Sequence, residues 1–377
     1  MQRAVIMSGS PHIENLWLKP TATLFDETGG NTGNLAFRYG LASHTRNVVF
    51  SHWNAPAEQI RAAGDILLLP LANQLGSHTD LGDMADRIEA IGLPVVGIGL
   101  GAQAASDAVD ATLTPGTERW LRTMIAHAPS DHPNLGVRGA YTLRQLDRLG
   151  LADRAVVTGC PSNFITMHDD FAPTLAARYD DRLGPVAVTA GIPYTQALQG
   201  LEEQLAQLVT DSGGAYIVQH GLEMLRLARG EFDALGAERL ELCRAYIRPG
   251  LDTAEFTRWC RRHAYAFFHL PGWLEFLRRF DFVVGTRFHG AMLALQVGVP
   301  AGVIAHDSRT HEMCVTMGVP VRLHTEVAEP VTADNLSTLF PFDPDVFLAK
   351  RRTLHAAYSQ ILVDAQIEMV APLRSMF

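Results

Sequence analysis

The stretch DFVVGTRFHGAMLALQVGVPAGVIAHDSRTHEM, residues 281–313, decides the fold. It opens with an apolar run that stops at Gly285, crosses a polar turn, and continues as an apolar segment of helical length that ends near Gly298. A second apolar run follows and ends in a second polar corner, residues 306–309. This pattern predicts a strand, helix, strand, helix unit. Because its two strands run parallel, both polar corners lie at the carboxyl edge of the sheet, where ligands of open α/β sheets bind.

Both polar corners carry cationic side chains. Arg287 and His289 stand in the first corner, and Arg309 stands in the second. The chain has 15 histidines, and one histidine considered alone is more often structural than catalytic. The neighbouring arginines change that assessment, because guanidinium groups hold carboxylates and phosphates with paired hydrogen bonds. The constellation predicts a crevice that binds an anion beside one titratable imidazole.

Short apolar bursts, each followed by a stretch of helical length, recur along the chain and indicate parallel sheets covered by helices. A first series lies at residues 4–7, 48–50, 66–69, 95–98, 135–137 and 155–157, and a second at residues 186–189, 216–218, 266–269, 282–284 and 302–305. A helix-rich insertion at 221–262 interrupts the second series. At the end of the chain, apolar residues at three and four spacing predict long helices.

The two series predict an α/β fold with two Rossmann-like domains that face a cleft. We expect an N-terminal domain at residues 1–168, on the side of an acceptor substrate, and a C-terminal domain at 169–342, which contains the Arg–Phe–His segment. Residues 343–377 are expected to form a long C-terminal helical segment that packs across the two domains.

The composition indicates a soluble enzyme. A formal charge of −9 and a pI near 5.9 argue against a protein that binds nucleic acid or acidic membranes over a broad surface. The longest apolar runs, around residues 66–72 and 93–101, fall short of the ~20 residues that a membrane-spanning helix needs. The N-terminus enters a strand-like run without the apolar region of a secretory signal, so a cytoplasmic location is expected.

Sequence signatures of metal and serine-hydrolase chemistry are missing. The four cysteines are far apart and form no CxxC pair, and neither HExxH nor a DxD arrangement occurs. The aspartates at 169–170 and 180–181 are adjacent, so neither pair reproduces DxD. A GxSxG motif is also missing. We therefore expect no metal and no bound cofactor.

Two glycine-containing loops have both a functional and a structural interpretation. The sequence NTGN at residues 31–34 leaves backbone N–H groups free for an anion, and Asn34 is expected to cap a helix that starts at Leu35. The alternative is a flexible, well-capped loop. GIGLGAQ, residues 97–103, lacks the full dinucleotide spacing because Ala102 stands at the last glycine position. Close backbone packing or cleft lining is the favoured interpretation there.

A third segment, GVRGAYT at residues 136–142, places Arg138 just before a helix that is expected to begin near Ala140. The amino end of a helix already carries partial positive charge, so an arginine there requires a compensating negative group. A structural carboxylate is one candidate and an anionic ligand is the favoured one.

These motifs together resemble the polysaccharide pyruvyltransferase family. GTRFHGAMLALQVGVP matches that family's RxH motif after a strand of the C-terminal domain, and the corner at Arg309 matches a D-x-K-like corner after the next strand. NTGN is similar to the family's NxGD loop, GVRGAYT to its arginine-containing segment, and TGCPSNF to the end of its first domain. Two positions depart from the pattern: Asn34 replaces an aspartate, and Arg309 replaces a lysine.

The resemblance implies a fold like that of the GT-B glycosyltransferases and a reaction with phosphoenolpyruvate. Pyruvate would be attached to sugar hydroxyls as a ketal, with release of phosphate. His289 and Arg138 would be the catalytic residues, with His289 as the acid. The donor-binding residues would be Arg287, Phe288, Arg309, Gly33 and Asn34.

The partners implied are phosphoenolpyruvate and a saccharide acceptor, either a glycan or a lipid-linked saccharide, without nucleic acid or a transmembrane segment. Peripheral membrane contact through a lipid-linked acceptor and homo-oligomerisation stay open. Two alternatives also stay open: a GT-B glycosyltransferase that uses a sugar nucleotide, and an inactive family member that binds a glycan or metabolite.

Overall fold

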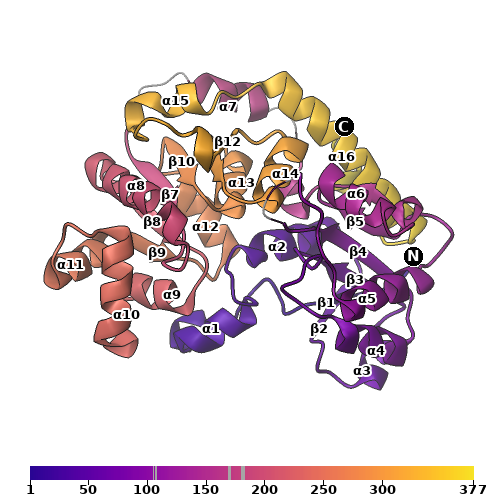
Figure 1. Ribbon diagram of the computed structural model, residues 1–377. Coiled ribbons are helices and arrows are strands. Elements are labelled where there is room, and N and C mark those ends of the chain that lie inside the picture. The colour runs from indigo at the N-terminus through magenta and orange to yellow at the C-terminus, as the bar shows by residue number, and fades with distance from the viewer. Residues whose placement is uncertain (105, 107, 169–170, 180–182) are drawn as a thin grey trace.

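The computed structural model describes residues 1–104, 106, 108–168, 171–179 and 183–377. Both adjacent aspartate pairs, at 169–170 and 180–181, lie outside the described residues, and the expected domain boundary falls at the edge of the first pair. Two six-stranded parallel sheets form two lobes (Figure 1). This is the predicted α/β architecture of two Rossmann-like halves.

The first sheet has the strand order β2-β1-β3-β4-β5-β6. Its strands are β1 (Ala4–Met7), β2 (Val48–Ser51), β3 (Ile66–Pro70), β4 (Val95–Leu100), β5 (Leu135–Val137) and β6 (Ala155–Val157). The helices of this half are α2 (Asn34–His44), α3 (Ala57–Ala63), α4 (Gly82–Ile91), α5 (Pro115–Ala126) and α6 (Ala140–Asp147). Each apolar burst of the first series thus forms a strand.

The second sheet has the order β12-β11-β10-β7-β8-β9. Its strands are β7 (Val186–Thr189), β8 (Ala215–Val218), β9 (Ala264–Ala266), β10 (Phe282–Gly285), β11 (Ala301–Ala305) and β12 (Val321–Leu323). Its helices are α8 (Gln199–Ser212), α9 (Leu222–Ala228), α10 (Phe232–Ile247), α11 (Thr253–His263), α12 (Leu270–Leu277), α13 (Phe288–Gln296), α14 (Ser308–Met317) and α15 (Leu336–Leu339). The unit predicted at 281–313 is β10, α13, β11 and α14.

The position predicted for one strand, residues 266–269, was wrong. The strand β9 ends at Ala266, and His269 instead caps α12, where its Nδ1 accepts a hydrogen bond of 3.1 Å from the Gly272 amide. Pro271 in the first turn favours a helix start, because it has no amide hydrogen to lose. The strand β12, at the sheet edge, was not predicted because its middle residue is the exposed Arg322, so it does not form an apolar run.

Burial on both faces explains why the strands read as continuous apolar runs. In β1, Ala4 and Ile6 belong to the core that extends into the second half, whereas Val5 and Met7 face a separate core under α3, α4 and α5. Successive side chains point to opposite faces of a strand, so a strand covered on both sides has no polar position.

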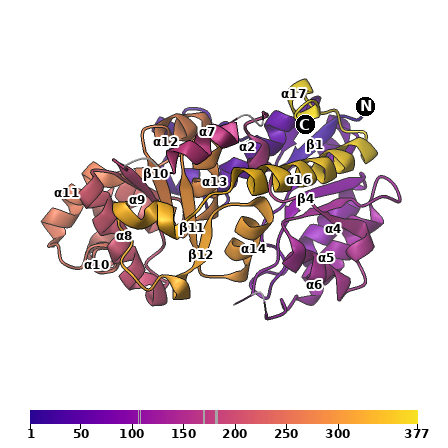
Figure 2. The same ribbon diagram turned by 90° about the horizontal axis from the view of Figure 1, so that it is seen from above.

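Several segments of the described chain pass between the halves. After β6 it passes through a 3-10 turn (Pro161–Phe164) and α7 (Phe171–Arg178) into the second half. The long helix α16 (Pro344–Asp364) then returns across the top of the molecule (Figure 2). The short helix α17 (Ala371–Arg374) follows and lies against α16, where the Leu373 carbonyl is 2.8 Å from His355 Nε2. The buried Arg351 of α16 donates hydrogen bonds to the carbonyls of Asn163 and His168, at 3.1 and 2.9 Å.

Another such segment lies early in the chain. Between β1 and α2 the chain leaves the first sheet and forms α1 (Thr21–Glu27), which lies beside α9 under the second half (Figure 1). Thr21 Oγ1 donates a 2.5 Å hydrogen bond to the Glu231 carboxylate, and Arg229 Nη2 donates to the Lys19 carbonyl at 3.2 Å. We call residues 8–31 the strap, because they tie the first half to the second.

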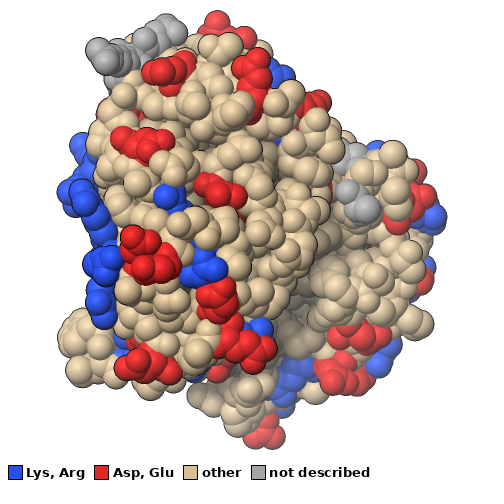
Figure 3. All heavy atoms as spheres, turned by 60° about the vertical axis from the view of Figure 1, so that its left-hand side comes forward, with Lys and Arg blue, Asp and Glu red and all other residues tan. Residues whose placement is uncertain are grey.

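The surface of the second half has mixed charge. Figure 3 shows acidic side chains spread over this face and basic side chains gathered along one edge. The face that is visible offers no broad basic area of the kind that nucleic-acid-binding proteins use. Among the described helices, none combines the length and the apolar content needed to cross a bilayer.

Burial of His44 generates a testable prediction about acid stability. Its ring bonds Tyr358 Oη and the Phe164 carbonyl, both at 3.0 Å, and joins α2 to α16 and the interdomain turn. Burial lowers the pKa of His44 from 6.5 to about 3. The unfolded chain therefore takes up a proton at higher pH than the folded chain, so stability is lost as the pH falls below 6.5.

In urea unfolding, we expect wild type to lose about 2 kcal/mol more than His44→Gln between pH 7 and pH 5. Glutamine supplies a donor and an acceptor but does not titrate in this range. Equal losses in the two proteins would contradict this assignment.

Candidate active site

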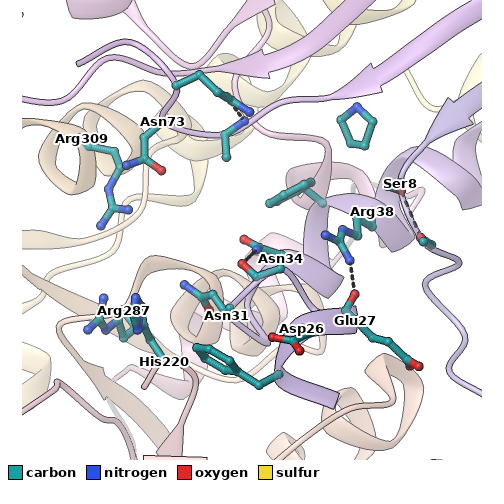
Figure 4. Close-up of a pocket in the computed structure, with 18 of the residues that line it drawn as sticks. Ser8, Asp26, Glu27, Asn31, Asn34, Arg38, Asn73, His220, Arg287 and Arg309 are labelled. Atoms are coloured by element: carbon teal, nitrogen blue, oxygen red, sulfur yellow. Dashed lines mark hydrogen bonds between the residues drawn. The ribbon is translucent and has the colours of Figure 1, made fainter. Parts of the chain in front are cut away.

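A cavity of about 780 Å³ lies between the halves (Figure 4). Most of its lining follows the carboxyl ends of strands: Ser8 and Gly9 after β1, His52 and Trp53 after β2, Ala72, Asn73 and Gln74 after β3, Gln103 after β4, Ile192 and Thr195 after β7, His220 after β8, Arg287 after β10, and His306, Asp307 and Arg309 after β11. The strap and the start of α2 supply the rest, including Asp26, Asn31, Asn34 and Arg38. Both sheets therefore present their carboxyl edges to one space.

Arg287 is positioned by the turn after β10. Its amide donates to Thr189 Oγ1 at 3.3 Å, and its Nε donates to the Ala190 carbonyl at 3.4 Å, both on the neighbouring strand end. Gly285 permits this approach, because a Cβ there would lie 2.3 Å from the Thr189 carbonyl oxygen. Burial and then the charge of Arg309 lower the pKa of Arg287. Its guanidinium thus lies in an unfavourable, cation-rich environment.

Arg309 lies in the first turn of α14, at the second predicted corner. Its Nη2 is 3.3 Å from Asp307 Oδ2, and Asp307 Oδ1 caps the helix by accepting from the Thr310 amide at 2.7 Å. Burial alone would raise the pKa of Asp307, but Arg309, His306 and the bonds from Thr310 together lower it. Arg287 and Arg309 line the same cavity, as the sequence predicted.

Arg138 approaches from the first half and is 2% exposed. Gly101 makes room for it, since a Cβ there would lie 2.9 Å from Arg138 Cδ. The buried Nε is unbonded, and no ion pair or side-chain hydrogen bond joins Arg138 to another residue in the described ranges. Burial lowers its pKa to about 10, with a further lowering from Arg309. The side chain therefore stays charged at neutral pH.

The sequence left two candidates for the negative group that compensates Arg138, a structural carboxylate and an anionic ligand. A carboxylate, Glu312 from α14, does lie at the amino end of α6, but it accepts from Thr142, at 2.6 Å from the amide and 2.8 Å from Oγ1. Glu312 thus caps the helix from the other half. The guanidinium of Arg138 keeps its donors for another group.

His289 lies in the first turn of α13, and it is partly exposed between the halves. Its Nε2 is 3.6 Å from Cys160 Sγ, and its ring centroid is 5.7 Å from that of Phe37. Burial, followed by the charges of Arg138 and Arg309, lowers the pKa of His289 well below 6.5. The imidazole is neutral at pH 7 in the protein without a bound anion.

Residues 31–34 touch the same histidine. A Cβ on Gly33 would lie 3.3 Å from His289 Nδ1 and 2.8 Å from Gln219 Oε1. The loop is held across the cleft, because the Thr32 amide donates to the Gln219 carbonyl at 2.8 Å. Gly33 is thus a contact between the halves next to the imidazole.

The predicted capping role of Asn34 was wrong. Helix α2 begins at Asn34 itself, with Gly33 in the cap position and no side-chain cap. The side-chain Nδ2 of Asn34 instead donates to the carbonyls of Thr28 and Gly29, at 2.9 and 3.2 Å. An aspartate at position 34 could not donate these bonds, because a carboxylate only accepts hydrogen bonds.

Phe288 and the 97–103 segment have mainly packing roles. Phe288 is 6% exposed and belongs to the core, with its ring edge-on to His289 at 5.4 Å. Gly97 and Gly101 allow close packing, against Leu71 and Arg138 respectively, and Gln103 lines the cavity. The favoured interpretation of that segment, packing and cleft lining, agrees with this geometry.

Several cavity residues were not predicted. His220 follows β8 as His289 follows β10, so the apolar run ending in Gln219 and His220 was a usable signal. Burial, with Arg287 and Arg309, lowers the pKa of His220 to about 4. Asp26 and Arg38 come from helices, where no strand end marks them.

Comparison with known proteins decides the family. A family model described as polysaccharide pyruvyl transferase matches residues 45–308, which include Arg138, Arg287 and His289. The chain belongs to the polysaccharide pyruvyl transferase family. The match ends one residue before Arg309 and begins after the 31–34 loop.

The other comparisons are more distant. No curated protein matches the sequence of this pyruvyl transferase family member. Similar solved structures include UDP-N-acetylglucosamine 2-epimerase from Rickettsia bellii (12% identity, 96% of this chain and 95% of that chain, TM-score 0.48). Another is a co-structure of MnaA with UDP from S. aureus (10% identity, 96% and 97%, TM-score 0.45). The family assignment does not draw on these likenesses.

The contact at Gly33 gives a prediction with a matched control. Gly33→Ala should lower the free energy of unfolding by about 1–3 kcal/mol, because the added methyl group overpacks against the buried Gln219. Gly200→Ala, in the exposed first turn of α8 with open space around it, should leave stability unchanged or raise it by up to about 1 kcal/mol. Equal stabilities of the two variants in chemical denaturation would show that Gly33 is not a close contact.

Proposed function

We propose that this protein transfers pyruvate from phosphoenolpyruvate to two hydroxyls of a glycan or lipid-linked saccharide, forming a ketal and releasing phosphate. The family supports a transferase with a saccharide acceptor. The observation that carries the donor assignment is that Arg287 and Arg309 line one cavity, while the charges of Arg309 and the buried Arg138 act on a neutral His289. An anion with two separate acidic groups suits this arrangement.

Phosphoenolpyruvate carries a carboxylate and a phosphate on adjacent positions of a small molecule. Arginine can bind either group with two parallel hydrogen bonds. Arg138 and Arg287 make no ion pair within the described part of the chain, and only Nε of Arg287 is bonded, so their Nη donors are available to such a ligand. We assign Arg287 and Arg309 to the donor from the second half, and Arg138 to the same donor from the first half.

Binding of this anion would change the protonation of His289. The charges of Arg138 and Arg309 help to keep the pKa of the free imidazole low. A bound dianion offsets those charges, so it raises the pKa of His289 and favours the imidazolium. Donor binding would thereby prepare the acid that the first step requires.

The proposed reaction then proceeds in two stages. His289 donates a proton to the methylene carbon of the donor, and the adjacent carbon becomes a cationic centre that a first sugar hydroxyl attacks. The second hydroxyl then displaces the phosphate and closes the ketal. One hydroxyl proton balances the proton gained at the methyl group, and the other leaves with the phosphate. No metal is invoked in this scheme.

The test is an assay of phosphate release with phosphoenolpyruvate and a panel of glycans and lipid-linked sugars. Release that requires both substrates is expected. His289→Asn should lower kcat by about 100-fold or more, because general acid catalysis contributes on that scale.

Arg138→Lys should raise the KM for phosphoenolpyruvate by about tenfold, because it keeps the charge but loses the paired hydrogen bonds. Arg258→Ala, an exposed arginine on α11, is the control and should behave as wild type. Release of nucleotide from a sugar nucleotide, without phosphate release, would favour a glycosyltransferase instead.

A further inference from the structure

The proposed reaction needs a proton acceptor as well as an acid, because each attacking hydroxyl must lose its proton. This inference rests on the proposed function. Three carboxylates line the cavity within the described ranges: Asp26, Glu27 and Asp307. The three carboxylates differ in their hydrogen bonds and ion pairs, and this difference points to Asp26.

Two of the three carboxylates are occupied. Glu27 binds Lys19 Nζ with both oxygens, at 2.7 and 2.9 Å. Asp307 caps α14 and faces Arg309 at 3.3 Å. Asp26 has no side-chain hydrogen bond or ion pair to another described residue, and it is exposed toward the cavity. Only Asp26 of these three offers both oxygens to a ligand.

The strap holds Asp26 in place although its side chain is unbonded. The Asp26 carbonyl accepts from the Gly29 amide at 2.9 Å, which closes the end of α1. The side-chain amide of Asn34 donates to the carbonyls of Thr28 and Gly29 in the same turn. Arg38 Nη1 adds a 2.8 Å bond to the Glu27 carbonyl. The turn that carries the Asp26 carboxylate is therefore held in place by hydrogen bonds to its backbone carbonyls.

The strap also brings Asp26 to the second half, which carries Arg287 and Arg309 of the proposed donor site. Helix α1 packs on α9, and an antiparallel bridge joins Asn31 to His220, itself beside Arg287 in Figure 4. The cavity imidazoles are poorer candidates for the base. His220 and His306 lie in the field of Arg287 and Arg309, and His52 lies after the edge strand β2, against Gly9.

We propose that Asp26 is the general base that accepts the proton of the attacking acceptor hydroxyl, and that the strap around it forms the acceptor subsite. The O–H bond of the sugar breaks as its oxygen bonds the cationic carbon of the protonated donor, and the proton passes to Asp26. Asp26 then returns this proton to solvent before the next turnover.

The test compares Asp26→Asn with Asp233→Asn, which makes the same change at an exposed position on α10 outside the cavity. With Asp26→Asn, kcat should fall by about 100-fold or more, the scale of general base catalysis. Its dissociation constant for phosphoenolpyruvate, measured by calorimetry, should stay within about threefold of wild type; this also shows that the variant is folded. Asp233→Asn should match wild type in both.

Chemical rescue separates a base from a structural residue. Asp26→Ala should recover part of its turnover when formate is added, because formate can occupy the space of the lost carboxylate. No rescue, or an Asp26→Asn variant with wild-type kcat, would overturn the assignment while leaving phosphate release by wild type intact. A large loss in His52→Gln with Asp26→Asn unaffected would also overturn it. No turnover by wild type with any acceptor would overturn the proposed function itself.

Discussion

Mutual repulsion among arginines gathered from two domains is the constraint on which the site depends. Burial and the charge of Arg309 lower the pKa of Arg287, and Arg138, almost fully buried, has no compensating bond among the described residues. Folding must bring these guanidinium groups together against that repulsion, and the hydrophobic cores behind both sheets supply the driving force. The arrangement has a physical reason if an anion occupies the cleft.

The fold creates this arrangement by simple geometry. Parallel strands end at one edge, so the turns after β10 and β11 present Arg287 and Arg309 to the same cavity. The second sheet faces the first, whose strand β5 delivers Arg138. The strap, α16 and the 31–34 loop then fix the halves relative to one another. The site is therefore a property of the interface rather than of either domain.

Sequence reasoning located the parts of the site that have a local signature. Arg287, His289 and Arg309 could be predicted because each follows an apolar run that reads as a strand, and Arg138 because it precedes a helix. Asp26 could not be found in this way, since its place depends on the docking of α1 onto α9. The same is true of Asn34, whose amide bonds carbonyls that only the folded strap brings near. The displaced strand at β9 shows the limit of apolar runs, which also begin buried helices.

The central claim is that the anionic donor charges His289 by offsetting the arginines around it. NMR titration of the His289 imidazole, assigned with His289→Asn, tests this most directly. In the free protein the pKa of His289 should lie well below 6.5. With saturating phosphoenolpyruvate the pKa of His289 should rise toward 7, and binding near pH 7 should be accompanied by uptake of a proton. A titration curve that phosphoenolpyruvate leaves unchanged would contradict the account.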